Sequence, residues 1–154
     1  MRPARALVLV SCLLLVYSVV AIVVAIAQDW PAEFSTTPSD DPQTVGQWIV
    51  RGSLVSAPLA PIAAQVVLTG LALLERYGWR LVAGVGFAVL GVVYTIGSLG
   101  EPLDPDRSDP PVIVYGAFRV VGLVAALTLV ILGVLTTRSA IRELRRRPGR
   151  AASP

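Results

Sequence analysis

Four long apolar runs occupy most of this 154-residue chain, and they restrict its fold more than any other feature. They cover residues 6–27, 54–74, 81–99 and 112–135. Each has about 19–24 residues, the length that a helix needs to cross a hydrocarbon layer of roughly 30 Å. Lipid offers the backbone no hydrogen-bond partners, so a run that crosses it must be helical. The sequence therefore predicts an all-α integral membrane protein, with a four-helix bundle in residues 1–135 and a basic tail in residues 136–154.

The arginines predict how the four runs are oriented. All 13 basic residues are arginines. In a four-span layout ten of them fall on one side and two on the other, while Arg119 lies within the last run. Loops rich in Lys and Arg stay in the cytoplasm, so both termini and the tail are predicted to be cytoplasmic in a multi-pass protein of the cell membrane. The alternative is a cleaved signal peptide, because the chain has a basic start and the small-x-small pattern of Ala25-Ile26-Ala27.

Small residues recur at helical spacing and predict where the helices touch, because helices in lipid associate through close packing of small side chains. The third run carries them at residues 84, 88, 91, 95 and 98, the fourth at 122, 126 and 133, and the first at 11, 18, 21 and 25. The second run begins with Pro58 and Pro61. Each proline removes a backbone donor, which predicts a kink near the outer end of that helix.

Arg119 is the one charge well inside a predicted span, about 10 Å from its outer end at Val112. A buried guanidinium is costly and is by default a candidate functional site. We expect Arg119 to face the bundle interior and to pair with Glu101, with Tyr94 and Gln65 completing an outer polar cluster. Two interpretations remain open for this cluster: a structural ion pair that anchors the helices, and a contact for a substrate anion or a lipid headgroup.

The tail concentrates positive charge directly after the fourth run. Its candidate contacts for anionic lipid are Arg138, Arg142, Arg145, Arg146 and Arg147. Such a cluster attracts anionic lipid at about 1 kcal/mol per residue near the surface. The alternative is a stop-transfer signal that only fixes orientation. Nothing breaks the helix before Pro148, so the fourth helix is predicted to continue to about Arg146.

The missing residue types limit the chemistry. The chain has no His and a single Cys, and no carboxylate lies inside any apolar run. Imidazole catalysis, zinc or haem bound through His, disulfide exchange and carboxylate-based proton coupling are therefore excluded or disfavoured. We expect no enzyme activity, cofactor, metal or nucleic-acid partner.

Two functions remain for a bundle of this kind. The expected function is that of a noncatalytic accessory, scaffold or partner-binding bundle in contact with membrane lipids and with a membrane-protein partner or a second copy of the chain. The alternative is a transporter or channel component with a polar or anion site around Arg119.

Overall fold

The computed structural model describes residues 3–28, 46, 57–74, 76–100 and 112–145. Four helices span these ranges: α1 (Pro3–Ala27), α3 (Leu59–Leu73), α4 (Tyr77–Gly100) and α5 (Val112–Arg145). Within this part of the chain, α1, α4 and α5 are long and apolar enough to cross a membrane. The apolar helix α3 has only 15 residues and falls below that length.

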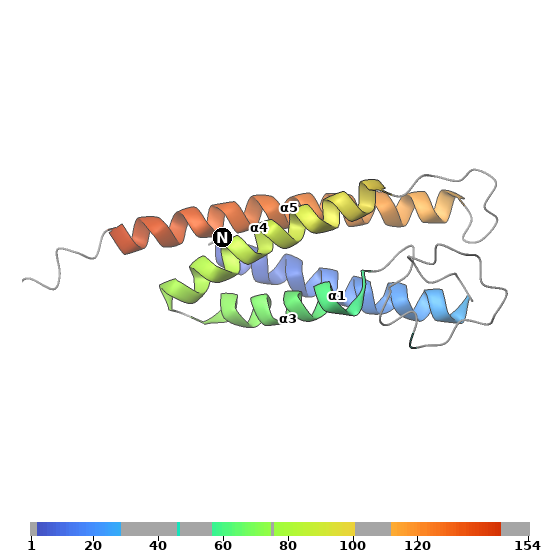
Figure 1. Cartoon of the computed structure of the whole chain (residues 1–154), viewed down its shortest axis with the longest axis horizontal. Coiled ribbons are helices and arrows are strands. Elements are labelled where there is room, and N and C mark those ends of the chain that lie inside the picture. Colours follow the sequence, from blue (N-terminus) through green and yellow to red (C-terminus); the bar gives the residue numbers. More distant parts are fainter. Residues whose placement is uncertain (1–2, 29–45, 47–56, 75, 101–111, 146–154) are drawn as a thin grey trace, which may run out of the picture.

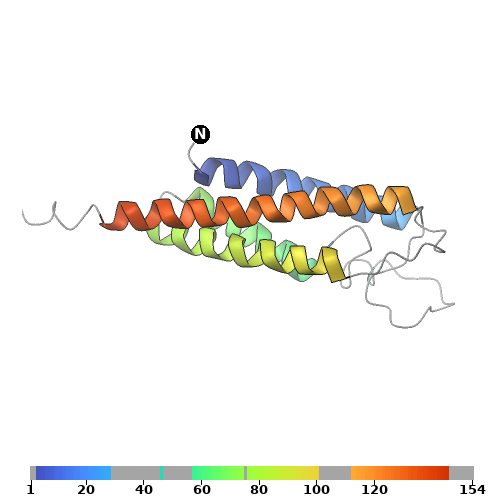
Figure 2. The same ribbon diagram turned by 90° about the horizontal axis from the view of Figure 1, so that it is seen from above.

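Consecutive helices run in opposite directions along a common axis (Figure 1). Helices α4 and α5 lie side by side and form the most extensive contact of the bundle (Figure 2). Helix α1 packs against α3 and α5, and α3 packs against α4. The start of α1, the α3–α4 turn and the end of α5 therefore share one end of the molecule, and the last turns of α5 project beyond the other helices.

Helix α3 begins later than the sequence predicts, and its prolines have a different role. The expected start was Leu54, but residues 54–56 lie outside the described residues, and Pro58 precedes the first helical residue, Leu59. Pro61 occupies the first turn, where backbone N–H groups have no partner within the helix. A proline there removes no hydrogen bond. The expected kink is therefore wrong: the two prolines mark where α3 starts.

The other helix boundaries extend the apolar runs into polar residues. Helix α4 starts at Tyr77 instead of Leu81, so Trp79 and Arg80 belong to its first turn and the link from α3 is shorter than predicted. Helix α5 continues without a break to Arg145, as the lack of a helix breaker before Pro148 predicts.

Helices α4 and α5 meet along a glycine seam, which comprises Gly84, Ala88 and Gly91 of α4 and Ala126 and Gly133 of α5. A Cβ atom added at Gly91 would lie 2.7 Å from the carbonyl oxygen of Ala126, and one added at Gly133 would lie 2.7 Å from the backbone nitrogen of Ala88. These distances are too short for a real Cβ, so glycine is required for the two backbones to approach this closely. The sequence predicted that the small faces of these two helices each contact a neighbouring helix; this is confirmed, and the structure shows that they contact each other.

The predicted small face of α1 is also buried. Ala21 and Ala25 have no exposed surface, Ser18 is almost covered, and the two alanines pack against Val114 and Phe118 of α5. The ring of Phe118 also contacts Tyr17 of α1, with the ring centroids 5.7 Å apart. This confirms that α1 uses small side chains to approach its neighbours.

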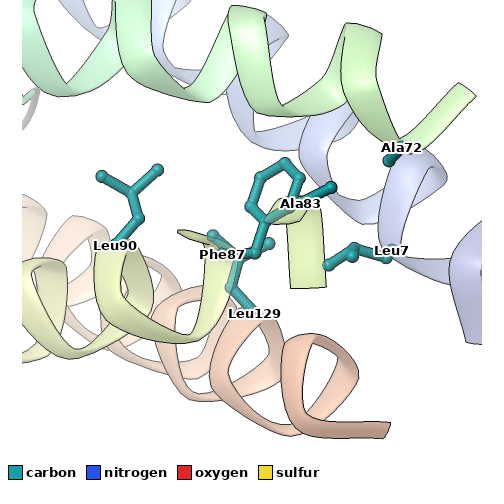
Figure 3. Close-up of a cluster of buried hydrophobic side chains, with 6 residues drawn as sticks. All are labelled: Leu7, Ala72, Ala83, Phe87, Leu90 and Leu129. Carbon is teal, nitrogen blue, oxygen red and sulfur yellow. The ribbon is translucent and has the colours of Figure 1, made fainter. Parts of the chain in front are cut away.

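A compact apolar core joins all four helices at the end that holds the start of α1. Figure 3 shows the side chains that form it, with Phe87 of α4 between neighbours from the other three helices: Leu7, Ala72, Ala83, Leu90 and Leu129 complete the cluster. Phe87 is fully buried. Because one aromatic ring contacts several helices, its removal would leave a void that no single helix can close.

The outer surface of the bundle is aliphatic. Large apolar side chains of every helix point outward, and examples are Leu13 (62% exposed), Val67 (61%), Ile96 (66%) and Ile131 (60%). Contiguous apolar surface of this extent is rare on soluble monomers, where it marks an interaction site for protein or membrane.

Candidate polar sites of the bundle

A buried amide network connects α1, α3 and α4, and it consists of Ser11, Gln65, Thr69 and Tyr94. The Gln65 side chain is fully buried. Its Nε2 donates to the carbonyl oxygen of Ser11 at 3.0 Å and to the Ser11 hydroxyl at 3.1 Å. Its Oε1 accepts a hydrogen bond from the Tyr94 hydroxyl at 3.1 Å. Both polar ends of the Gln65 amide are therefore hydrogen-bonded, the nitrogen to α1 and the oxygen to α4.

Thr69 completes the network one turn further along α3. Its hydroxyl lies 2.7 Å from the Ser11 hydroxyl and donates to the backbone carbonyl oxygen of Gln65, also at 2.7 Å. Positions 65 and 69 are four apart, so one face of α3 presents both side chains to α1. An unpaired amide in an apolar interior costs several times the net value of one hydrogen bond. The network therefore fixes how α3 is rotated and how far it can slide along α1.

Arg119 contacts the end of α4. Its Nη2 donates to the carbonyl oxygen of Leu99 at 3.1 Å. Leu99 belongs to the last turn of α4, whose carbonyl groups have no partner within the helix. A cation at a helix C-terminus also interacts favourably with the helix dipole. Arg119 thus points toward protein, as predicted from the sequence, and caps the C-terminus of α4.

The outer polar cluster predicted from the sequence is assembled only in part. The structure joins Gln65 to Tyr94 and places Arg119 on a separate contact with Leu99. Glu101, the expected ion-pair partner, lies outside the described residues, so that pairing stays a prediction. Ser11 and Thr69 were not among the partners predicted for Gln65. The small residue at position 11 was predicted to contact another helix, but the sequence does not show that this helix is α3.

The basic end of the bundle is the third polar feature. Arg138, Arg142 and Arg145 are exposed on the last turns of α5, whereas Arg146 and Arg147 lie outside the described residues. Among the described residues, three buried polar atoms have no hydrogen-bond partner: Arg80 Nε and the hydroxyl oxygens of Thr136 and Thr137. They lie toward the same end, where α4 begins and α5 leaves the bundle.

Among the described residues, no group of three His, Cys, Asp or Glu side chains is placed to hold a metal ion. The polar atoms of the buried amide network are satisfied by one another, and Arg119 binds a backbone carbonyl. The arrangement is suited to holding helices in register. No family model, curated protein or solved structure matches this chain.

Proposed function

We propose that this chain is a membrane-embedded four-helix bundle, with both termini cytoplasmic, that serves as a noncatalytic accessory or scaffold for a membrane-protein partner. One observation carries the proposal: a hydrogen-bonded network of four polar side chains is buried in the interior, while large aliphatic side chains cover the outside. Such an inside-out distribution suits a lipid solvent, in which exposed apolar side chains cost nothing.

The placement of arginine supports the orientation. The helix directions bring arginines of three separate segments to one end of the bundle (Figure 1). These are Arg5 in α1, Arg76 and Arg80 around the start of α4, and Arg138, Arg142 and Arg145 in α5. Arg119 lies in the half of α5 nearer the opposite end. Under the positive-inside rule, the arginine-rich end is the cytoplasmic one.

The short helix α3 is compatible with four crossings. Fifteen residues extend about 22 Å, less than a hydrocarbon layer of roughly 30 Å. However, α3 runs antiparallel to α1 and α4 and packs against both. If its neighbours cross the membrane, α3 lies at the same depth, and local thinning of the bilayer accommodates a short apolar segment at modest cost.

A scaffold role is tested by isolating the chain in its native membranes. A tagged chain is extracted in mild detergent, and the mass and stoichiometry of what accompanies it are measured. Photo-crosslinkers at the exposed Leu13 and Ile131 should join the chain to one larger membrane protein in fixed ratio. The same crosslinker at the buried Leu7 is the matched control and should give only crosslinks within the chain.

The transport alternative is examined with the same purified chain in lipid vesicles. The scaffold proposal is contradicted if the chain is isolated alone and moves an anion across the vesicle membrane. That flux should then disappear in Arg119→Leu while the bundle remains folded. Arg119 would in that case be a ligand for the solute, and its bond to Leu99 would be secondary.

A further inference from the structure

An open groove of about 570 Å³ lies between the start of α1 and the C-terminal part of α5. Its α1 wall is formed by Pro3 and Ala6, and the facing part of α5 contributes Leu132 and Leu135. This size falls within the range of small-molecule sites. The stretch of the groove that these four residues line is apolar, and it is built by two helices that are far apart in sequence.

The other stretch of the groove is charged. Further along α5 the groove is lined by Arg138, Arg142 and Glu143. The two arginines are four residues apart and share one helix face. Among the described residues neither guanidinium takes part in an ion pair. The guanidinium fork is well suited to a phosphate group, because it donates two parallel hydrogen bonds. The two arginines outweigh the single carboxylate, so the lining is net positive.

The depth of the groove matches the boundary between hydrocarbon and headgroups. A hydrocarbon layer of roughly 30 Å that begins at Val112 extends over about 20 residues of α5 and ends near Leu132. Arg138 lies about 9 Å further along the axis and Arg142 about 15 Å. Side chains on a helix lean toward its N-terminus, so both guanidinium groups are directed back toward the membrane. Leu132 and Leu135 thus meet acyl chains, the Arg138 guanidinium meets the phosphate layer, and the Arg142 guanidinium approaches that layer from its outer side.

We propose that this groove binds one anionic phospholipid, with its phosphate on Arg138 and Arg142 and the upper part of an acyl chain against Ala6, Leu132 and Leu135. The inference rests on the membrane location in the proposed function. It differs from a diffuse attraction of the basic tail to anionic lipid, because it assigns a stoichiometric site to particular arginines.

The test compares two double variants that remove the same charge from the same end of the bundle. Arg138→Gln with Arg142→Gln alters the groove, whereas Arg76→Gln with Arg145→Gln changes two exposed arginines outside it. The purified full chain is titrated in detergent with phosphatidylglycerol or with phosphatidylcholine of the same acyl chains, and bound lipid is counted by native mass spectrometry.

We expect one phosphatidylglycerol per chain, bound about 30-fold more weakly by the groove variant and within about threefold of normal by the control. Glu143→Gln should strengthen binding about fivefold, which keeps the proposal testable if the groove variant does not fold. Equal losses in both double variants, or equal binding of phosphatidylcholine, would overturn the site.

Membrane integration is measured separately by resistance to alkaline extraction. A chain that is extracted contradicts the proposed membrane location. An integrated, helical chain that retains no phosphatidylglycerol contradicts only the groove.

Discussion

A single methyl group on α4 should separate the effect of the glycine seam from that of helix propensity. At Gly91 a new Cβ would lie 2.7 Å from the Ala126 carbonyl oxygen and 2.9 Å from the Val130 nitrogen. At Gly97, on the same helix, nothing lies within 4 Å. Gly91→Ala and Gly97→Ala are therefore identical in chemistry and differ in what the methyl group meets.

The distances set the expected magnitude. Ordinary contact begins at 3.4 Å, so α4 and α5 must move apart by about 0.7 Å at Gly91. A gap of 0.5–1 Å already removes about a quarter to a half of the dispersion energy of the atoms concerned. Overpacking of this kind typically costs about 1–3 kcal/mol. At Gly97 the alanine should instead stabilise the helix by about 0.5–1 kcal/mol, because glycine is the poorer helix former.

The assay is the free energy of unfolding in mixed micelles, followed by circular dichroism as the denaturing detergent is increased. The gain in helix propensity is the same in both variants, so Gly91→Ala should be less stable than Gly97→Ala by the overpacking cost alone, about 1–3 kcal/mol. Gly86→Ala is an intermediate case, because its Cβ would meet the flexible end of the Leu68 side chain, which can rotate away. If the two variants at positions 91 and 97 are equally stable, the close backbone contact of α4 and α5 does not exist.

Four further changes follow from the same contacts. Gln65→Leu removes three side-chain hydrogen bonds and should lower the free energy of unfolding by about 2 kcal/mol, while Tyr94→Phe removes one and should lower it by about 0.6 kcal/mol, measured in the same micelles. Arg119→Leu leaves the Leu99 carbonyl without its cap and should lower it by about 0.5–1 kcal/mol, with amide exchange increasing in the last turn of α4. Phe87→Ala leaves a void between the helices and should be the most harmful change, at about 3 kcal/mol or more.

Matched controls distinguish these effects from general damage. Within the described part of the chain, the Ser18 hydroxyl bonds only to the Leu14 carbonyl oxygen of its own helix, so Ser18→Ala should leave stability nearly unchanged. Leu13→Ala shortens a side chain that faces outward and should cost much less than Phe87→Ala. If Ser18→Ala is as harmful as Gln65→Leu, or Leu13→Ala as harmful as Phe87→Ala, the assignment of interior and exterior faces is wrong.

The sequence predicts the helices and their small-residue contacts because both depend on local pattern. Residues such as Gly84, Gly91 and Gly133 recur at helical spacing. Their lack of a side chain is needed only where two helices pack closely. The start of α3 was harder to predict, because an apolar run does not show where a helix begins when prolines interrupt its first turn. The hydropathy of Leu54 to Ala57 resembles that of the helix proper, so hydropathy alone does not show that the helix begins only after Pro58.

The partners of polar side chains were predicted less well than the helices. Burial of Gln65 follows from its place in an apolar run, and its contact with Tyr94 was expected. Its bonds to Ser11 depend on the relative rotation of α1 and α3, which no single-helix pattern contains. Likewise, the bond of Arg119 to the Leu99 carbonyl oxygen was not predicted, although the free carbonyl groups at a helix end also accept hydrogen bonds from a guanidinium. The predicted pairing with Glu101 lies outside the described residues and stays a prediction.

The most direct test of the account is a measurement of which side of the membrane each connection occupies. Cys12 is replaced by Ala, and single cysteines are introduced at Ser39, Gly78, Ser108 and Ser153 for labelling by a membrane-impermeant maleimide in intact and permeabilised cells. We predict that positions 39 and 108 are labelled in intact cells, and that positions 78 and 153 are labelled only after permeabilisation. Labelling of position 78 in intact cells would show that α3 does not cross the membrane and would contradict the four-span bundle.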